Sequence, residues 1–174
     1  MVVERYGCFG GNLTHVGVEG IGWYRQKETI DVEGIGFEFE ERAKRFGSSA
    51  PEPQSMSHAN NGEMFKVVAD NWIQECGIRP LLHSLAVDLI RDGRSLKGIV
   101  IQNKSGRQAI LAKRIIDATG DADIAHLAGV PLKKTPKEEM LSVTVVFSCA
   151  GVNKAHFLQY VKENPQKYKD WGKN

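Results

Sequence analysis

An acidic residue near the start of the chain, Glu4, directly follows two β-branched valines and precedes a glycine-dense stretch. In nucleotide-binding βαβ units, an acid at the end of the second strand accepts the ribose hydroxyls, about 20 residues after a glycine-rich turn. Glu4 stands where that acid would stand, although it could also be an ordinary surface carboxylate. Because Met1 is only three residues earlier, we expect the chain to be a piece of a larger protein.

Gly10 and Gly11 are followed by two polar residues, Asn12 and Thr14. Glycines allow a close approach of the backbone to a ligand, and backbone N–H groups in such a turn can bind a phosphate. The pattern therefore predicts that these amides and the Thr14 hydroxyl contact a pyrophosphate. The alternative is a tight turn with nothing bound.

A second glycine turn, Ala118-Thr119-Gly120-Asp121, follows the apolar residues Ile115 and Ile116. Ligands of open α/β sheets bind at the carboxyl ends of the strands, where small residues let the backbone approach them. This pattern predicts a ligand contact by Thr119, Gly120 and Asp121. A strand-to-helix turn capped by Asp121 is the alternative.

Several other side chains could take part in catalysis, but a structural role is the favoured interpretation for each of them. His15 and His58 are isolated in the sequence, and Cys8 is interpreted as a small packed thiol rather than a reactive one. The aromatic cluster Trp23-Tyr24-Arg25 could line a pocket, but packing is the usual role of aromatic residues. No catalytic residue and no metal site is predicted.

The bulk composition narrows the class of protein. The 174 residues suit one domain with part of a second, and the interspersed 23 basic and 21 acidic residues, net charge +2, do not favour binding to nucleic acid. No apolar run is long enough to span a bilayer, so no membrane association is expected. Three scattered cysteines favour a reducing, cytoplasmic location over a disulfide framework.

Hydrophobic periodicity and turn residues predict the elements that position these candidates. Met1–Glu4 reads as the end of a buried strand, helices are expected over Thr29–Phe46 and from Asn61 to Gly77, and an exposed loop separates those helices. A β-meander should follow, and then a strand, a short helix, a charged linker, another strand and a last helix. The strands of the meander are expected at Arg79–His83, Leu85–Asp92, Leu96–Asn103 and Gln108–Leu111. The next strand is Lys113–Asp117, the short helix Ala122–Ala128, the charged linker Lys133–Glu139, the following strand Leu141–Ala150 and the last helix Asn153–Glu163.

In this order, the motifs resemble those of the FAD-dependent oxidoreductases, in the glutathione reductase-like flavoprotein superfamily near the fumarate reductase-type flavoproteins. The resemblance covers roughly residues 1–130. It implies that FAD is the cofactor and that ten residues bind it, with Glu4 on the adenosine ribose and Val87 on adenine through its backbone. The ten residues are Glu4, Arg5, Gly10, Gly11, Asn12, Thr14, Val87, Thr119, Gly120 and Asp121.

The same resemblance predicts an α/β fold: a partial FAD-binding, Rossmann-like domain with a β-meander that lacks the first βα unit. Residues 1–130 would form this domain, with a helical insertion at 27–76, and residues 131–174 would begin a substrate or cap domain. The G-x-G-x-x-G turn and a later Gly-Asp segment of the family are missing, so the chain alone should be inactive. The parent protein would transfer hydride between the flavin and a small-molecule substrate, and it could be a homo-oligomer. A non-catalytic binding or oligomerisation module is the alternative.

Overall fold

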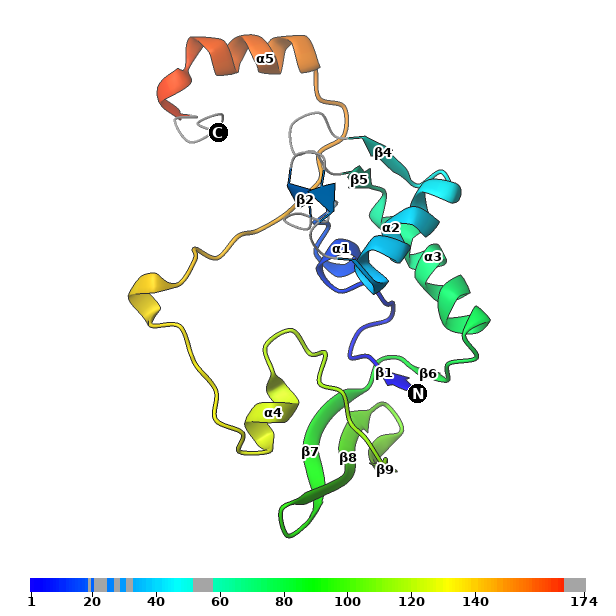
Figure 1. Cartoon of the computed structure of the whole chain (residues 1–174). Helices are drawn as coiled ribbons and strands as arrows, with labels where there is room; N and C mark the ends of the chain where they lie inside the picture. Colours follow the sequence, from blue (N-terminus) through cyan, green and yellow to red (C-terminus); the bar gives the residue numbers. More distant parts are fainter. Residues whose placement is uncertain (19, 21–24, 27–28, 31–32, 52–57, 168–174) are drawn as a thin grey trace. The chain divides into compact units, whose positions relative to one another are not determined.

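The computed structural model describes residues 1–18, 20, 25–26, 29–30, 33–51 and 58–167 (Figure 1). The chain divides into two compact units, residues 1–143 and 144–174, and each is described by itself. The first unit contains both helices and strands, which is consistent with an α/β protein. The Rossmann-like detail, the domain boundary at residues 130 and 131 and the insertion at 27–76 stay predictions.

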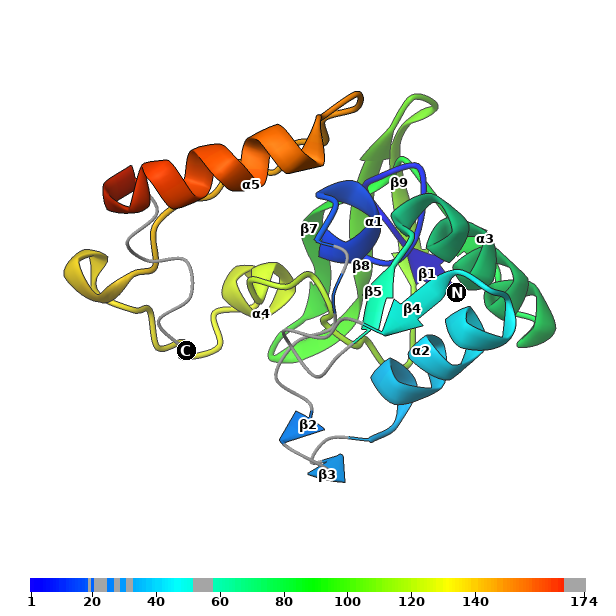
Figure 2. The ribbon, with the colours of Figure 1, turned by 90° about the horizontal axis from the view of Figure 1, so that it is seen from above.

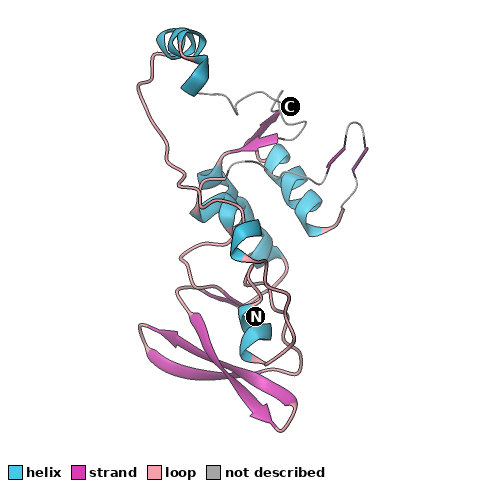
Figure 3. Cartoon of the chain, turned by 90° about the vertical axis from the view of Figure 1, so that its left-hand side faces the viewer, coloured by secondary structure: helices cyan, strands magenta, loops and turns pink. Residues whose placement is uncertain are grey.

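The largest sheet is an antiparallel meander of three strands, β7 (Leu85–Asp92), β8 (Ser95–Asn103) and β9 (Gly106–Leu111), in the order β7-β8-β9 (Figure 3). Tight turns join the strands at Gly93 and Ser105, as the turn residues in the sequence predict. The side chain of Ile101, in the middle strand β8, is completely buried. The predicted meander is therefore confirmed.

Two short strands, β1 (Val2–Val3) and β6 (Pro80–Leu81), pair in parallel. The backbone beyond them continues the pairing, because Glu4 N donates to Leu81 O at 2.9 Å and Ser84 N donates to Glu4 O at 2.9 Å. Both predicted strands are confirmed in their central residues, although the valines of β1 are half-buried rather than buried. Glu4 is thus held at the carboxyl end of β1.

Helices α2 (Ile35–Arg45) and α3 (Gly62–Glu75) pack together and form the core of the first unit (Figure 2). Phe39 of α2 stacks on Phe65 of α3 with ring centroids 4.0 Å apart. Phe65 also packs against Leu13, which belongs to the one-turn helix α1 (Asn12–His15). This contact ties the predicted pyrophosphate turn to the helical core.

Two predictions between residues 29 and 61 are wrong in detail. Thr29–Ile30 forms strand β3, paired with β2 (Arg25–Gln26), and the helix begins only at Ile35. Gly34, with a φ of 88°, separates strand from helix, because only glycine adopts that conformation easily. The predicted exposed loop instead contains an antiparallel pair, β4 (Ser49–Pro51) and β5 (His58–Asn60), and its residues 52–57 lie outside the described part of the chain.

Two predicted strands, Lys113–Asp117 and Leu141–Ala150, are also wrong, because both segments are irregular. A strand needs a neighbour for its backbone hydrogen bonds, and neither segment pairs with another described residue. Helix α4 (Asp123–Leu127) and helix α5 (Lys154–Glu163) are where the sequence predicts them. Two 3₁₀ turns, η1 (Lys137–Glu139) and η2 (Pro165–Lys167), complete the described elements.

Candidate functional site

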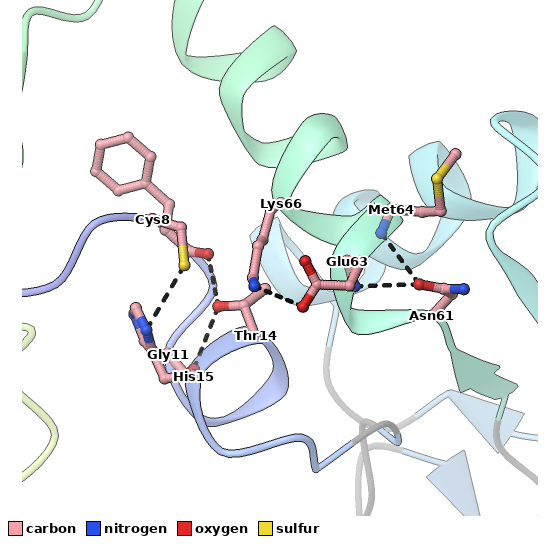
Figure 4. Close-up of polar contacts among 9 residues, drawn as sticks. Cys8, Gly11, Thr14, His15, Asn61, Glu63, Met64 and Lys66 are labelled. Atoms are coloured by element: carbon pink, nitrogen blue, oxygen red, sulfur yellow. Dashed lines mark hydrogen bonds and ion pairs between the residues drawn. The ribbon is translucent and has the colours of Figure 1, made fainter. Parts of the chain in front are cut away.

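The glycine segment, residues 7–14, is shaped by the side chain of Thr14 (Figure 4). The Thr14 hydroxyl donates to Phe9 O at 2.7 Å and makes a longer contact of 3.3 Å with Gly11 O. A hydroxyl carries only one hydrogen, and these two carbonyls take it. Thr14 is 7% exposed, so in this structure it supports the turn from inside.

Three glycines allow the segment to turn so tightly. A Cβ on Gly10 would lie 2.5 Å from Thr14 Cγ2, and a Cβ on Gly7 would lie 2.7 Å from the ring of His83. Gly11 has a φ of 56° and only open space where its Cβ would be. The backbone at Gly11 and the exposed Asn12 is therefore open to a ligand.

Glu4 lies next to this segment and is half-buried. Its Oε1 accepts a hydrogen bond of 2.9 Å from the backbone N–H of Tyr6, which fixes the direction of the carboxylate. A carboxylate has about four acceptor positions, so Glu4 keeps capacity for ribose hydroxyls. Arg5 is exposed, and its guanidinium carbon lies 4.7 Å from the centre of the Tyr6 ring.

A thiol and an imidazole meet at the glycine segment. Cys8 Sγ lies 3.6 Å from His15 Nδ1, and the Tyr6 ring lies against the His15 ring with centroids 4.1 Å apart. The other ring nitrogen of His15, Nε2, is buried and has no hydrogen-bond partner among the described residues. A buried polar atom without a partner is uncommon, and it marks a place where a ligand atom could bind.

Val87 lies in β7 at an irregularity of the meander. Ala86 faces Ile101 and Asp88 faces Val100, so Val87 is the extra residue of a β-bulge. Bulges leave one residue outside the regular ladder and are frequent next to binding sites. The predicted contact between the Val87 backbone and adenine is compatible with this geometry.

The second glycine turn, Thr119–Asp121, is organised by Asp117, a residue that the sequence argument missed. Asp117 Oδ1 accepts from Thr119 N at 3.1 Å and from the Thr119 hydroxyl at 2.7 Å, while Oδ2 accepts from Ala125 N at 2.8 Å. Partial burial would raise the pKa of Asp117, but the hydrogen bonds from Thr119, Ala125 and Ile124 outweigh it and lower the pKa below its ordinary value. The carboxylate therefore stays ionised near neutral pH.

The backbone around this turn is unusual for a helix start. Gly120 has a φ of 94°, with open space in front of it, and Ala122, the N-cap of α4, is left-handed with a φ of 59°. A left-handed alanine costs roughly 1–2 kcal/mol, and its methyl group cannot cap the helix. The signal that could have pointed to Asp117 is the Asp-x-Thr spacing, which is typical of an Asx turn.

The structure brings the predicted residues together in two groups rather than one. Glu4 and the glycine segment form one group, and the turn at Thr119–Asp121 forms the other. Within the described part of the chain, no hydrogen bond or ion pair joins the two groups. Of the aromatic cluster, Trp23 and Tyr24 lie outside the described residues, and so does the side chain of His58.

Two surface depressions of the described residues lie elsewhere. One is lined by Lys97, Leu111, Ala112 and Lys113, and the other lies on α5 around His156. Neither includes a residue predicted to bind FAD.

The whole chain, residues 1–174, matches the family model described as FAD dependent oxidoreductase. The protein belongs to the FAD-dependent oxidoreductase family. Among curated proteins, none matches the chain. The family match confirms the resemblance to the FAD-dependent oxidoreductases and makes FAD the cofactor of this oxidoreductase, while the placement near the fumarate reductase-type flavoproteins stays a prediction. It does not favour the alternative of a non-catalytic module.

The chemistry of both groups is compatible with an FAD molecule. Gly11 and Gly120 each leave room where a side chain would stand, and the buried Nε2 of His15 lacks a partner among the described residues. Glu4 keeps acceptor positions at the carboxyl end of β1. These observations concern the chain's own atoms, and the role of each residue toward FAD stays a prediction.

None of the described helices has the length and apolar character that crossing a membrane requires.

Proposed function

We propose that this chain supplies the adenosine and pyrophosphate side of the FAD site in an oxidoreductase that acts on a small molecule. The observation that carries the proposal is the position of Glu4. Its carboxylate follows a strand in parallel pairing and precedes a glycine turn that is open to solvent. This is the arrangement in which an acid accepts ribose hydroxyls.

In this proposal, each group of residues has a distinct task. Glu4 binds the ribose, and the backbone N–H groups of Gly10, Gly11 and Asn12 bind the pyrophosphate, where oriented amides stabilise negative charge. Thr14 holds that backbone in place, because its hydroxyl hydrogen is directed to carbonyls of the same segment. The exposed Arg5, which follows Glu4 in the chain, adds a positive charge beside the residue that binds the ribose.

The backbone at the Val87 bulge contacts the adenine, and Gly120 with Asp121 contacts the remaining part of the dinucleotide. When bound, FAD supplies hydride transfer at the flavin, and the protein supplies orientation and electrostatics. Residues 131–174 begin a substrate or cap domain. A homo-oligomer and a cytoplasmic location complete the proposal.

The test is a titration of the purified chain with FAD, followed by flavin fluorescence. Wild type should show saturable binding. Glu4→Gln keeps one carbonyl oxygen for Tyr6 N–H but loses the charge, so FAD affinity should fall roughly 10- to 100-fold, as expected when a charge-assisted hydrogen bond is lost. Glu139→Gln, which changes an exposed glutamate of η1, is the matched control and should bind like wild type. Unchanged affinity of Glu4→Gln would remove the ribose role.

A further inference from the structure

Thr119 is one of the residues that the sequence predicts to contact FAD, and its hydroxyl is already hydrogen-bonded within the protein. It donates its hydrogen to Asp117 Oδ1 at 2.7 Å and accepts from the backbone N–H of Asp123 at 2.9 Å. A hydroxyl has one hydrogen to donate, so Thr119 has none left for a phosphate oxygen. The residue that determines the shape of the turn is therefore Asp117.

Asp117 also replaces the missing cap of helix α4. An N-cap side chain normally accepts from the second and third backbone N–H groups of its helix. In α4 these belong to Ile124 and Ala125, and the N-cap residue, Ala122, has no side-chain acceptor. Asp117 accepts from Ala125 N at 2.8 Å, and the backbone N–H of Ile124 also helps to lower its pKa. One carboxylate thus joins the start of the turn to the helix behind it.

The turn between these anchors carries the exposed residues. Gly120 and Asp121 are exposed, whereas Asp117 is half-buried and has both its oxygens engaged inside the turn. A loop that is held in its bound shape before the ligand arrives loses less conformational entropy on binding. Asp117 can therefore influence a ligand at Gly120 without touching it.

We propose that Asp117 is a positioning residue for cofactor binding, which holds the turn Thr119–Asp121 in the shape that presents Gly120 and Asp121 to FAD. The inference rests on the proposed function, and it adds a role for Asp117 beside the FAD contacts predicted for Thr119, Gly120 and Asp121. Thr119 belongs to the same network, because its hydroxyl links the Asp117 carboxylate to the backbone N–H of Asp123 through two hydrogen bonds.

The experiment compares FAD affinity among four variants of the full chain. Asp117→Asn removes one acceptor and the charge, and Thr119→Val removes the hydroxyl with little change of shape. Each should weaken FAD binding by about tenfold, as the loss of a charge-assisted hydrogen bond does. Thr119→Ser keeps the hydroxyl and should bind like wild type. Asp92→Asn, an exposed aspartate at the end of β7 whose carboxylate lies 3.8 Å from Lys97 Nζ, is the control for charge.

The double variant Asp117→Asn/Thr119→Val separates positioning from direct contact. Residues of one hydrogen-bond network are not additive, so the double variant should bind FAD no more weakly than the weaker single variant. Additive losses would mean that Thr119 contacts FAD by itself, and this would overturn the inference. Wild-type affinity of Asp117→Asn would overturn it as well, while leaving the proposed function intact. Absence of saturable FAD binding by wild type would overturn the proposed function and the inference together.

Hydrogen exchange of the wild-type chain gives a measurement that needs no variant. The amides of Thr119 and Ala125, which donate to Asp117, should be protected before FAD is added and should change little when it binds. Amides that become protected only with FAD would show that the turn is not held in advance, and this would overturn the inference. The measurement remains decisive if Asp117→Asn fails to fold.

Discussion

At the scale of single residues, Gly10 shows how closely the glycine segment is packed against its own threonine. The φ of Gly10 is 111°, and a Cβ there would lie 2.5 Å from Thr14 Cγ2 and 2.8 Å from Thr14 Oγ1. Gly10→Ala should therefore lower the free energy of unfolding by about 1–3 kcal/mol, the usual range for a strained backbone position. Urea unfolding measures this change, and an FAD titration should show weaker binding because Thr14 is displaced.

Gly36→Ala is the matched control for that prediction. Gly36 is an exposed residue of α2, and a Cβ added to it would meet nothing within 4 Å. Alanine should raise the free energy of unfolding by roughly 0.5–1 kcal/mol, because glycine is a poor helix residue. If Gly10→Ala were as stable as Gly36→Ala, the packing described for the glycine segment would be contradicted.

The sequence identifies residues well when their role depends on neighbours in the sequence. It identifies them less well when their partners are distant in the sequence and are brought close only by the fold. Gly10 and Gly11 could be selected because glycine pairs indicate a turn with unusual φ angles. For Asp117 the local signal is the Asp-x-Thr spacing, but this spacing does not reveal the contact with Ala125, which is eight residues away along the chain and is brought close only by the turn. Thr14 and Thr119 could be selected, but the direction of their hydroxyl hydrogens could not be read from the sequence.

At the scale of elements, helix α3 supports the glycine segment. Asn61 caps this helix, since its Oδ1 accepts from Glu63 N and Met64 N, each at 3.1 Å. Asn61→Ala should lower the free energy of unfolding by about 1 kcal/mol, within the range of roughly 0.5–2 kcal/mol known for N-caps. Urea unfolding followed by circular dichroism tests this. FAD binding should weaken slightly, because Phe65 of α3 packs on Leu13.

Asn153→Ala removes the equivalent cap from α5, whose Asn153 Oδ1 accepts from His156 N at 3.0 Å. Because α5 belongs to the second compact unit, the unfolding transition of residues 1–143 should stay where it is in wild type. A shift as large as that of Asn61→Ala would mean that the two units unfold together. The two variants, Asn61→Ala and Asn153→Ala, therefore show whether loss of a helix cap in one unit changes the stability of the other unit.

Helices and hairpins were predicted correctly where their signals are local. The cap Asn61 and the stop at Gly77 define α3, and turn residues define the meander. Lys113–Asp117 and Leu141–Ala150 have the composition of strands, but a strand also needs a partner, which sequence composition cannot show. The helix predicted from Thr29 failed at its start, where Gly34 interrupts it.

At the scale of the whole molecule, the segment Leu141–Ala150 is an exposed apolar run of the described chain. It contains no charged residue, and Leu141, Val143, Val145 and Phe147 are 95%, 97%, 82% and 77% exposed. Uncharged runs of high β-propensity that lie open to solvent tend to pair with other chains. We therefore expect the isolated chain to self-associate through this segment.

Val145→Lys should reduce that self-association, because it places a charge in the middle of the segment. Burying a valine contributes about 1.5–3 kcal/mol, so the concentration at which the chain associates should rise roughly tenfold or more. Sedimentation over a series of protein concentrations measures the change. Val18→Lys, at a 43% exposed valine outside the segment, is the control and should associate like wild type. Equal association of Val145→Lys and wild type would show that any oligomer forms through another surface. Weaker self-association of Val145→Lys would mean that the chain associates through this segment. The composition of Leu141–Ala150 favours a β-strand, and among the described residues no strand pairs with it, so a second copy would supply the missing neighbour.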